Sequence, residues 1–259
     1  MPSGQRCQPL CRRDGRRSGL SIQAVLPDVH GESEDATNCE EFTAARHHGT
    51  GVKTTAIPSF RPALVAVVDI GSPAKGRLGW YASPADQGGQ DVEVLTDLLA
   101  KALSQGPCAL GFEAPMFVPY GRELNRLTSA RVGERNRSWS AGAGAGALAT
   151  ALVIVPYVLR RLRDKAPSVR AVLDWRQPPS NAGELLLFEA FVTSRSKGSD
   201  HVDDARLAAR KFESACPYLD GSNAIAEEDC LGLLGAALLR TGWTTDLTVL
   251  ESPVLVVMA

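Results

Sequence analysis

Three acidic residues follow apolar segments, where a carboxylate is costly unless something pairs with it or binds it. Asp69 comes after the apolar residues 63–68, and Glu113 comes after residues 108–112. Glu189 comes after the apolar residues 185–188. The arrangement occurs three times, which suggests that the three acids act together.

These three acids have the chemistry of a metal site. Mg²⁺ and Mn²⁺ prefer carboxylate oxygens, and a folded sheet can bring distant acids into one cluster. Phosphoryl-transfer sites are built in this way. We therefore predict that Asp69, Glu113 and Glu189 are catalytic residues and ligands of Mg²⁺ or Mn²⁺. Structural explanations stay open for each acid, namely a turn cap at Asp69, a turn-forming glutamate paired with a nearby arginine at Glu113, and a structural ion pair at Glu189.

A fourth acid is expected at the start of a helix, and two segments compete for this role. Asp204 lies in one segment and Asp229 in the other. Acids at helix starts commonly complement the helix dipole, but such a carboxylate also points across the end of a sheet. Both are therefore candidate catalytic residues. Nearby His201 is a candidate for proton transfer, or simply a hydrogen-bonding residue.

A basic segment follows Glu113 and is a candidate nucleic-acid contact. Its arginines could bind a phosphate backbone beside the acids. They are Arg122, Arg126, Arg131, Arg135 and Arg137. Trp139 could stack on an unpaired base. The alternative is a solvated helix face with one aromatic anchor in the core.

The composition indicates a globular α/β protein that does not span a membrane. The chain has 259 residues and a net charge of −1 at pH 7, so a nucleic-acid contact has to be regional. Its six cysteines form no CxxC pair, which favours reduced thiols and a cytoplasmic location. The longest apolar stretch, 141–159, is rich in glycine and interrupted by Pro156. Nothing in the sequence indicates the oligomeric state.

Residues 1–61 differ from the remainder, because arginines at the start are followed by a polar stretch without periodicity. We predict a disordered N-terminal extension and a domain over 62–259. Apolar periodicity within the domain predicts strands at 63–69, 76–83, 108–113, 169–175, 184–192 and 254–257. It predicts helices at 92–104, 122–137, 141–162, 203–216 and 226–240. This order implies a mixed central sheet flanked by helices.

The chain resembles the RNase H-like superfamily, in particular its uncharacterised predicted-nuclease branch, and is distantly similar to Holliday-junction resolvases. The resemblance rests on four segments from residue 63 onward. They are Val67-Val68-Asp69-Ile70-Gly71, Gly111-Phe112-Glu113-Ala114-Pro115, Phe188-Glu189-Ala190-Phe191 and the acid-headed segment 228–237.

The resemblance implies an RNase H-like mixed sheet with a two-metal carboxylate site at the carboxyl ends of its strands. Asp69 would bridge the ions, and Glu113, Glu189 and Asp229 would complete the cluster. The chain departs from the family pattern because Cys230 follows Asp229, while the pair Asp204-Ala205 matches the pattern equally well.

The implied function is a metal-dependent nuclease that hydrolyses phosphodiester bonds in DNA or RNA. The alternative is a non-catalytic RNase H-like module for nucleic-acid binding or assembly, in which residues 122–137 would be the working surface. An actin-like sugar kinase ranks last, because the chain is short for two lobes and lacks a second glycine-rich phosphate loop.

Overall fold

A computed structural model describes residues 59–134, 138–192, 197–227 and 229–259. Most of the predicted extension, residues 1–58, therefore lies outside the described residues. Phe60 belongs to the folded unit, although the predicted domain begins at residue 62. Its backbone N–H donates to the Pro217 carbonyl at 2.7 Å, and its ring packs edge-on against Phe212.

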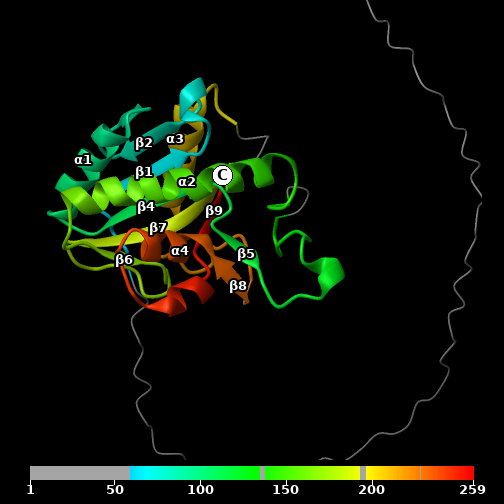
Figure 1. The fold of residues 1–259 in the computed structure, drawn as a ribbon. Helices are drawn as coiled ribbons and strands as arrows, with labels where there is room; N and C mark the ends of the chain where they lie inside the picture. Colours follow the sequence, from blue (N-terminus) through cyan, green and yellow to red (C-terminus); the bar gives the residue numbers. More distant parts are fainter. Residues whose placement is uncertain (1–58, 135–137, 193–196, 228) are drawn as a thin grey trace, which may run out of the picture. The chain divides into compact units, whose positions relative to one another are not determined.

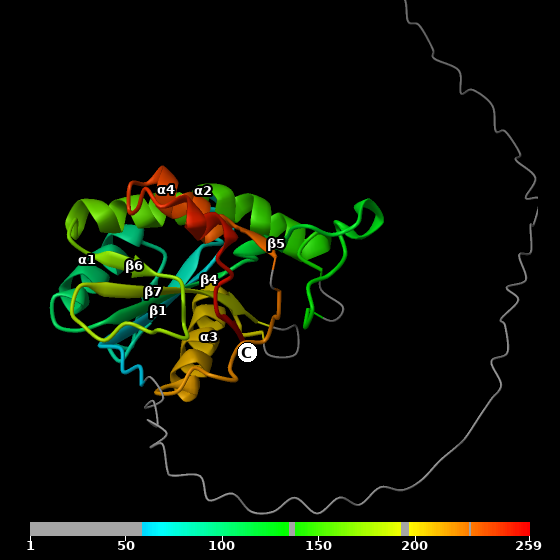
Figure 2. The ribbon, with the colours of Figure 1, turned by 90° about the horizontal axis from the view of Figure 1, so that it is seen from below.

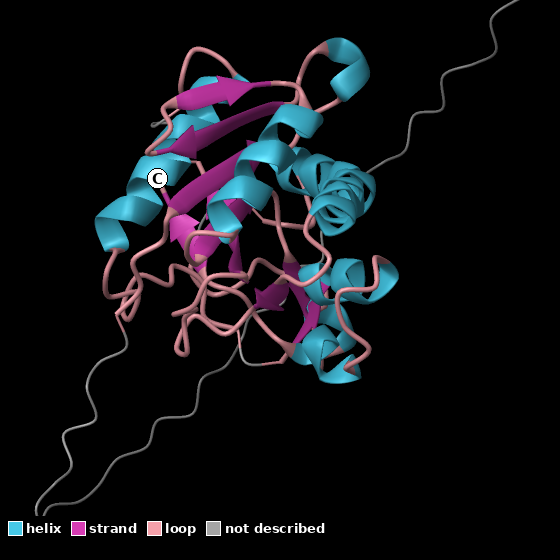
Figure 3. Cartoon of the chain, turned by 90° about the vertical axis from the view of Figure 1, so that its left-hand side faces the viewer, coloured by secondary structure: helices cyan, strands magenta, loops and turns pink. Residues whose placement is uncertain are grey.

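The centre of the structure is a mixed sheet, drawn in magenta in Figure 3, and Figure 1 labels most of its strands. The strand order is β3-β2-β1-β4-β7-β6. Strands β1, β2 and β3 are antiparallel neighbours, whereas β4, β7, β6 and β9 run parallel to β1. Both β6 and β9 pair with β7, toward its two ends. The bounds are β1 Leu64–Asp69, β2 Gly79–Ser83, β3 Gln87–Gly89, β4 Cys108–Glu113, β6 Arg170–Val172, β7 Glu184–Phe191 and β9 Val256–Met258.

Helices cover both faces of this sheet (Figure 2). Helices α1 (Val92–Leu103), α2 (Gly142–Lys165) and α4 (Leu233–Arg240) contribute to the core on one face, and α3 (His201–Ala215) packs on the other. Strand β1 is buried on both sides, which explains its continuous apolar sequence. The predicted mixed α/β architecture with flanking helices is confirmed.

Helix α3 begins close to the carboxyl end of β1 because Gly79, which faces its first turn, has no side chain. Asp200 caps the helix by accepting hydrogen bonds from the backbone N–H groups of residues 202 and 203. Gly79 pairs with Asp69 across β1 and β2. A Cβ atom at Gly79 would lie 2.5 Å from the carbonyl carbon of His201. The missing side chain therefore lets the first turn of α3 approach the end of β1.

Two predicted helices differ from the structure. Residues 122–137 do not form a helix in their described part, where only the short 3₁₀ turn η2 (Leu124–Arg126) is helical. The predicted helix 226–240 begins only at Leu233. Preceding residues form β8 (Cys230–Gly232), which pairs with β5 (Phe117–Pro119). This tertiary pairing overrides the helical periodicity of the segment. Two further 3₁₀ turns are η1 (Pro73–Lys75) and η3 (Leu247–Glu251).

Helix α2 is the one described helix that is long and apolar enough to cross a membrane by length and composition. It continues through Pro156 to Lys165. Its buried residues, among them Val155 and Leu159, belong to the core that it shares with α1 and α4. One such helix is weak evidence for a membrane protein, and this helix packs as part of a folded domain. The cytoplasmic location stays a prediction.

The close approach of α3 to the sheet predicts the effect of Gly79→Ala. The added methyl group overlaps the backbone of His201, so the substitution should destabilise the protein by about 1–3 kcal/mol. Urea unfolding of the purified protein measures this change. Gly89→Ala in β3 is the matched control, because its methyl group would make only ordinary contacts of 3.5 Å or more with Trp80. Equal losses in the two variants would contradict the packing described here.

Candidate metal centre

Three acids from separate elements meet at the carboxyl end of the sheet. Asp69 and Glu113 end β1 and β4, and the strand register places them side by side. Asp204 lies in the first turn of α3. One carboxylate oxygen from each residue can be chosen so that all three lie within 4.8 Å of one another. This cluster contains two acids of the predicted metal set, together with the competing candidate Asp204.

Glu113 is the least compensated member of the cluster. Its Oε2 atom is buried and has no hydrogen-bond partner among the described residues. Burial, followed by the nearby charges of Asp69 and Asp204, raises the pKa of Glu113 to about 9. Without a cation, Glu113 therefore holds a proton at neutral pH. A bound cation would satisfy the unpartnered oxygen and favour loss of that proton.

Asp69 and Asp204 each have partners within the protein. The Nδ1 atom of His201 lies 2.5 Å from Asp69 Oδ2. Burial raises the pKa of Asp69, and His201 opposes this shift through its hydrogen bond and charge. The Gly198 backbone N–H donates to Asp204 Oδ1 at 2.6 Å, and Lys197 Nζ lies 3.7 Å from Asp204 Oδ2. These contacts orient the two carboxylates, and the Oδ1 atom of Asp69 takes no part in them.

Glu189 does not join the cluster, and its predicted role as a metal ligand is not supported by its position. In the parallel pairing of β4 with β7 it lies opposite Phe112, while Glu113 comes one residue later. Side chains alternate between the faces of a strand, so Glu189 points away from the α3 face on which Glu113 lies. Gly111 helps to set this register, because a Cβ atom there would lie 2.4 Å from the Phe188 ring.

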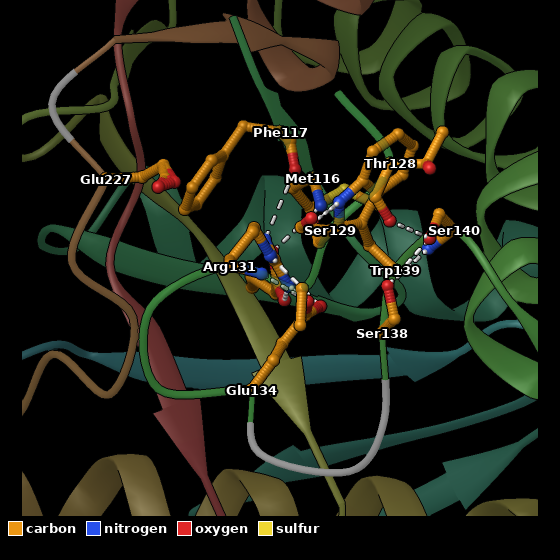
Figure 4. A network of polar contacts seen from close by, with 12 residues as sticks. Met116, Phe117, Thr128, Ser129, Arg131, Glu134, Ser138, Trp139, Ser140 and Glu227 are labelled. Atoms are coloured by element: carbon orange, nitrogen blue, oxygen red, sulfur yellow. Dashed lines mark hydrogen bonds and ion pairs between the residues drawn. The ribbon is translucent and has the colours of Figure 1, made fainter. Parts of the chain in front are cut away.

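Glu189 instead forms a buried ion pair with Arg131. The guanidinium donates to Glu189 Oε1 at 2.6 Å and to Oε2 at 2.8 Å, and both side chains are fully buried. Glu134 accepts from the same guanidinium, and the Phe117 carbonyl oxygen lies 3.2 Å from it (Figure 4). The Met116 backbone N–H also donates to Glu189, at 2.9 Å. Glu189 is therefore one half of a buried ion pair, which is the structural alternative to a metal ligand.

The arginine segment is only partly available for a ligand. Arg131 is buried, so its predicted contact with nucleic acid is wrong. Arg122 donates to both carboxylate oxygens of Glu227 at 2.5 Å. Arg126 is exposed on η2. Arg135 and Arg137 lie outside the described residues.

Trp139 forms a hydrogen bond within the protein. Its indole N–H donates to the Ser129 carbonyl oxygen at 3.1 Å, and the Ser140 hydroxyl donates to the Thr128 carbonyl oxygen at 2.6 Å (Figure 4). These bonds tie the segment before α2 to the segment that carries Arg131. Base stacking by Trp139 stays an untested prediction.

Asp229 lies outside the cluster. It is exposed and precedes β8 rather than heading a helix, because the β5–β8 pairing uses the residues that follow it. Its carboxylate lies beside Gly121, whose positive φ of 70° belongs to the turn after β5. Asp204 is therefore the helix acid that the fold brings to Asp69, and the proposed ligand role of Asp229 is corrected.

A cavity of about 710 Å³ opens beside the acids. Asp69, Glu113 and His201 line it on the sheet side. The first turns of α2 and the loop after β1 form other parts of its wall. Its size is that of a small-molecule site.

Sequence reasoning did not assign Glu134, Lys75 or Arg77 to this region. All three line the cavity. Glu134 lies three residues after Arg131, a spacing typical of ion pairs, but nothing in the sequence marks that pair as buried. Lys75 and Arg77 flank Gly76 between β1 and β2. Arg77 falls within the predicted strand 76–83, so nothing in the sequence placed it beside the acids.

The chain was compared with protein-family models, curated proteins and solved structures, and none of the three comparisons found a match.

The buried Arg131 site predicts a large loss of stability for Arg131→Met. The substitution leaves Glu189 and Glu134 buried without their cation, which should cost about 3–5 kcal/mol in the free energy of unfolding. Chemical denaturation of both proteins measures the difference. Arg126→Met, at an exposed arginine, should change stability by no more than about 0.5 kcal/mol. Comparable stabilities of the two variants would contradict the assignment of Arg131 to the core.

Proposed function

We propose that the protein is a metal-dependent nuclease of the RNase H-like type, with Mg²⁺ or Mn²⁺ held by Asp69, Glu113 and Asp204. One observation carries the proposal. Three carboxylates converge within 4.8 Å, and one of them has a buried oxygen without a partner. A mixed sheet with acids at the carboxyl ends of its strands supports the resemblance to this superfamily.

The donor set fits a hard divalent cation. Three carboxylates supply oxygen ligands only, which favours Mg²⁺ or Mn²⁺ over softer metals. Among the described residues, neither histidine nor cysteine belongs to the three-residue cluster. Mg²⁺ usually keeps several waters and binds through a few carboxylates together with substrate phosphates. The adjoining cavity leaves room for both.

The residues around the acids prepare them for this role. His201 holds one oxygen of Asp69 and so fixes the orientation of that carboxylate. The Gly198 N–H does the same for Asp204. When bound, a divalent cation supplies a water of lowered pKa and stabilises negative charge on the leaving oxygen of a phosphodiester. Glu113, protonated without a cation, would give up its proton when a cation binds.

The non-catalytic alternative has less support. It relies on the arginines of residues 122–137 as the working surface. Among the described residues of this segment, Arg131 is buried and Arg122 is paired with Glu227. The acid cluster would also have no task in a protein that only binds nucleic acid.

Metal titration with DNA and RNA substrates tests the proposed function. We expect Mg²⁺- or Mn²⁺-dependent cleavage of at least one substrate by the wild-type protein. Asp69→Asn should lower the rate at least about 100-fold, because a neutral amide is a poor ligand for a hard cation.

Two further variants make this test specific. Asp204→Asn should lose Mn²⁺ binding, measured by calorimetry, whereas Asp229→Asn should bind as the wild type does. Asp229 is the matched control because it is exposed and lies outside the cluster. Cleavage that survives in Asp69→Asn, or absence of both metal binding and cleavage in the wild type, would count against the proposal.

The raised pKa of Glu113 predicts how stability depends on pH. The unfolded chain loses this proton near its ordinary pKa of about 4.5, and the folded protein holds it up to about 9. Between these values the folded state binds more protons, so metal-free wild-type protein becomes less stable as the pH rises.

Glu113→Gln removes this dependence because the amide stays neutral. Its melting temperature should exceed that of wild type at pH 9, by about 2–4 °C for each kcal/mol of unfolding free energy that the wild type loses. The two melting temperatures should match near pH 4.5. Scanning calorimetry in the presence of a chelator measures both. Parallel pH profiles for the two proteins would contradict the proton on Glu113.

A further inference from the structure

The cavity beside the acids has a cationic edge. Lys75 and Arg77 line it and are exposed, and neither forms an ion pair with another described residue. Both belong to the turn between β1 and β2, which begins at Ser72, three residues after Asp69. Lys197 lines the same cavity. Three positive side chains therefore line the cavity that Asp69 and Glu113 also line.

The turn that carries these cations is held in a defined position. The Ser72 carbonyl oxygen accepts hydrogen bonds from the backbone N–H groups of Lys75, at 3.1 Å, and Arg77, at 3.0 Å. Gly76 has a φ of 63°, which glycine adopts at low cost. A Cβ atom at Gly71 would lie 1.7 Å from the Arg77 carbonyl oxygen. The turn is thus drawn tightly against the loop after β1.

The remaining walls of the cavity offer an apolar surface for the ring of a ligand and leave space for the ligand to approach. Ile70, Phe191 and Val192 supply apolar surface beside the acids. On the side formed by α2, a Cβ atom at Gly146 would meet no atom within 4 Å, so this wall opens into the cavity and is not closed by packing.

We infer that this cavity binds a nucleoside phosphate, either free or as an unpaired nucleotide of a strand. The phosphate lies between the cationic turn and the acids, and the base lies on the apolar surface at Phe191. The inference rests on the proposed function, because a phosphate can approach three carboxylates only when a cation shields them. A cavity of about 710 Å³ is of the size that holds one small ligand and is too small to enclose a duplex.

Binding of dTMP in the presence of Mn²⁺ tests this inference, because dTMP contains no phosphodiester bond to be cleaved. Calorimetry on the full chain gives its affinity, and competition with single-stranded or duplex thymidine oligonucleotides distinguishes the sources of the nucleotide. The double variant K75Q/R77Q should bind dTMP at least about tenfold more weakly, because two charge-assisted contacts are lost. The control R210Q/K211Q removes the same charge from exposed positions that do not line the cavity.

A second variant tests the opposite wall without removing charge. Gly146→Leu projects into the cavity and replaces a weak helix former by a strong one, so the protein should fold and bind dTMP at least about tenfold more weakly. Ala149→Leu is the control, because Ala149 is exposed on the same helix and does not line the cavity.

The outcomes separate this inference from the proposed function. Weaker dTMP binding in both cavity variants, with unchanged Mn²⁺ binding and unaffected controls, supports the inference. Equal dTMP affinity in all variants, or no dTMP binding by wild-type protein that has bound Mn²⁺, overturns it and leaves the metal site intact. Competition by duplex alone also overturns it. Wild-type protein that binds no Mn²⁺ refutes the proposed function and, with it, this inference.

Discussion

The repulsion among three partly buried carboxylates is the constraint on which the rest of the site depends. Asp69, Glu113 and Asp204 share a space in which burial and mutual repulsion disfavour three negative charges. His201 and Lys197 compensate part of that charge, and Glu113 is left with an oxygen that nothing in the described protein satisfies. A proton relieves the repulsion in the absence of metal, and a divalent cation would relieve it more completely. The cluster is thus costly as a structural element and well suited to metal binding.

The acids of the cluster and Glu189 lie on opposite faces of the sheet and have different surroundings. Asp69 and Glu113 share the α3 face, where Asp204 approaches them. Glu189 lies one register position away, on the other face, where Arg131 neutralises it. A buried ion pair of this kind adds little stability by itself, but losing one partner is expensive. It fixes the segment that carries Glu134 next to the cavity.

Much of the sheet and the acids Asp69 and Glu113 could be predicted from the sequence, which also offered Asp204 as one of two candidates for the helix acid. Asp69 and Glu113 were predictable because a charge at the end of an apolar strand is visible locally. The role of Glu189 depended on a register of one residue, which tertiary contacts such as Phe188 on Gly111 determine. The choice between Asp204 and Asp229 depended on the pairing of β5 with β8, which joins segments more than 100 residues apart. Such long-range contacts leave no periodic signal in either segment.

The location of a bound ion tests the central claim most directly. Crystals soaked in Mn²⁺ should show an anomalous scattering peak among the carboxylates of Asp69, Glu113 and Asp204. The peak should be absent from crystals of Asp204→Asn and present in those of Asp229→Asn. A peak at Glu134 or Asp229 instead, or no peak at saturating Mn²⁺, would contradict the assignment of a metal centre to these three acids.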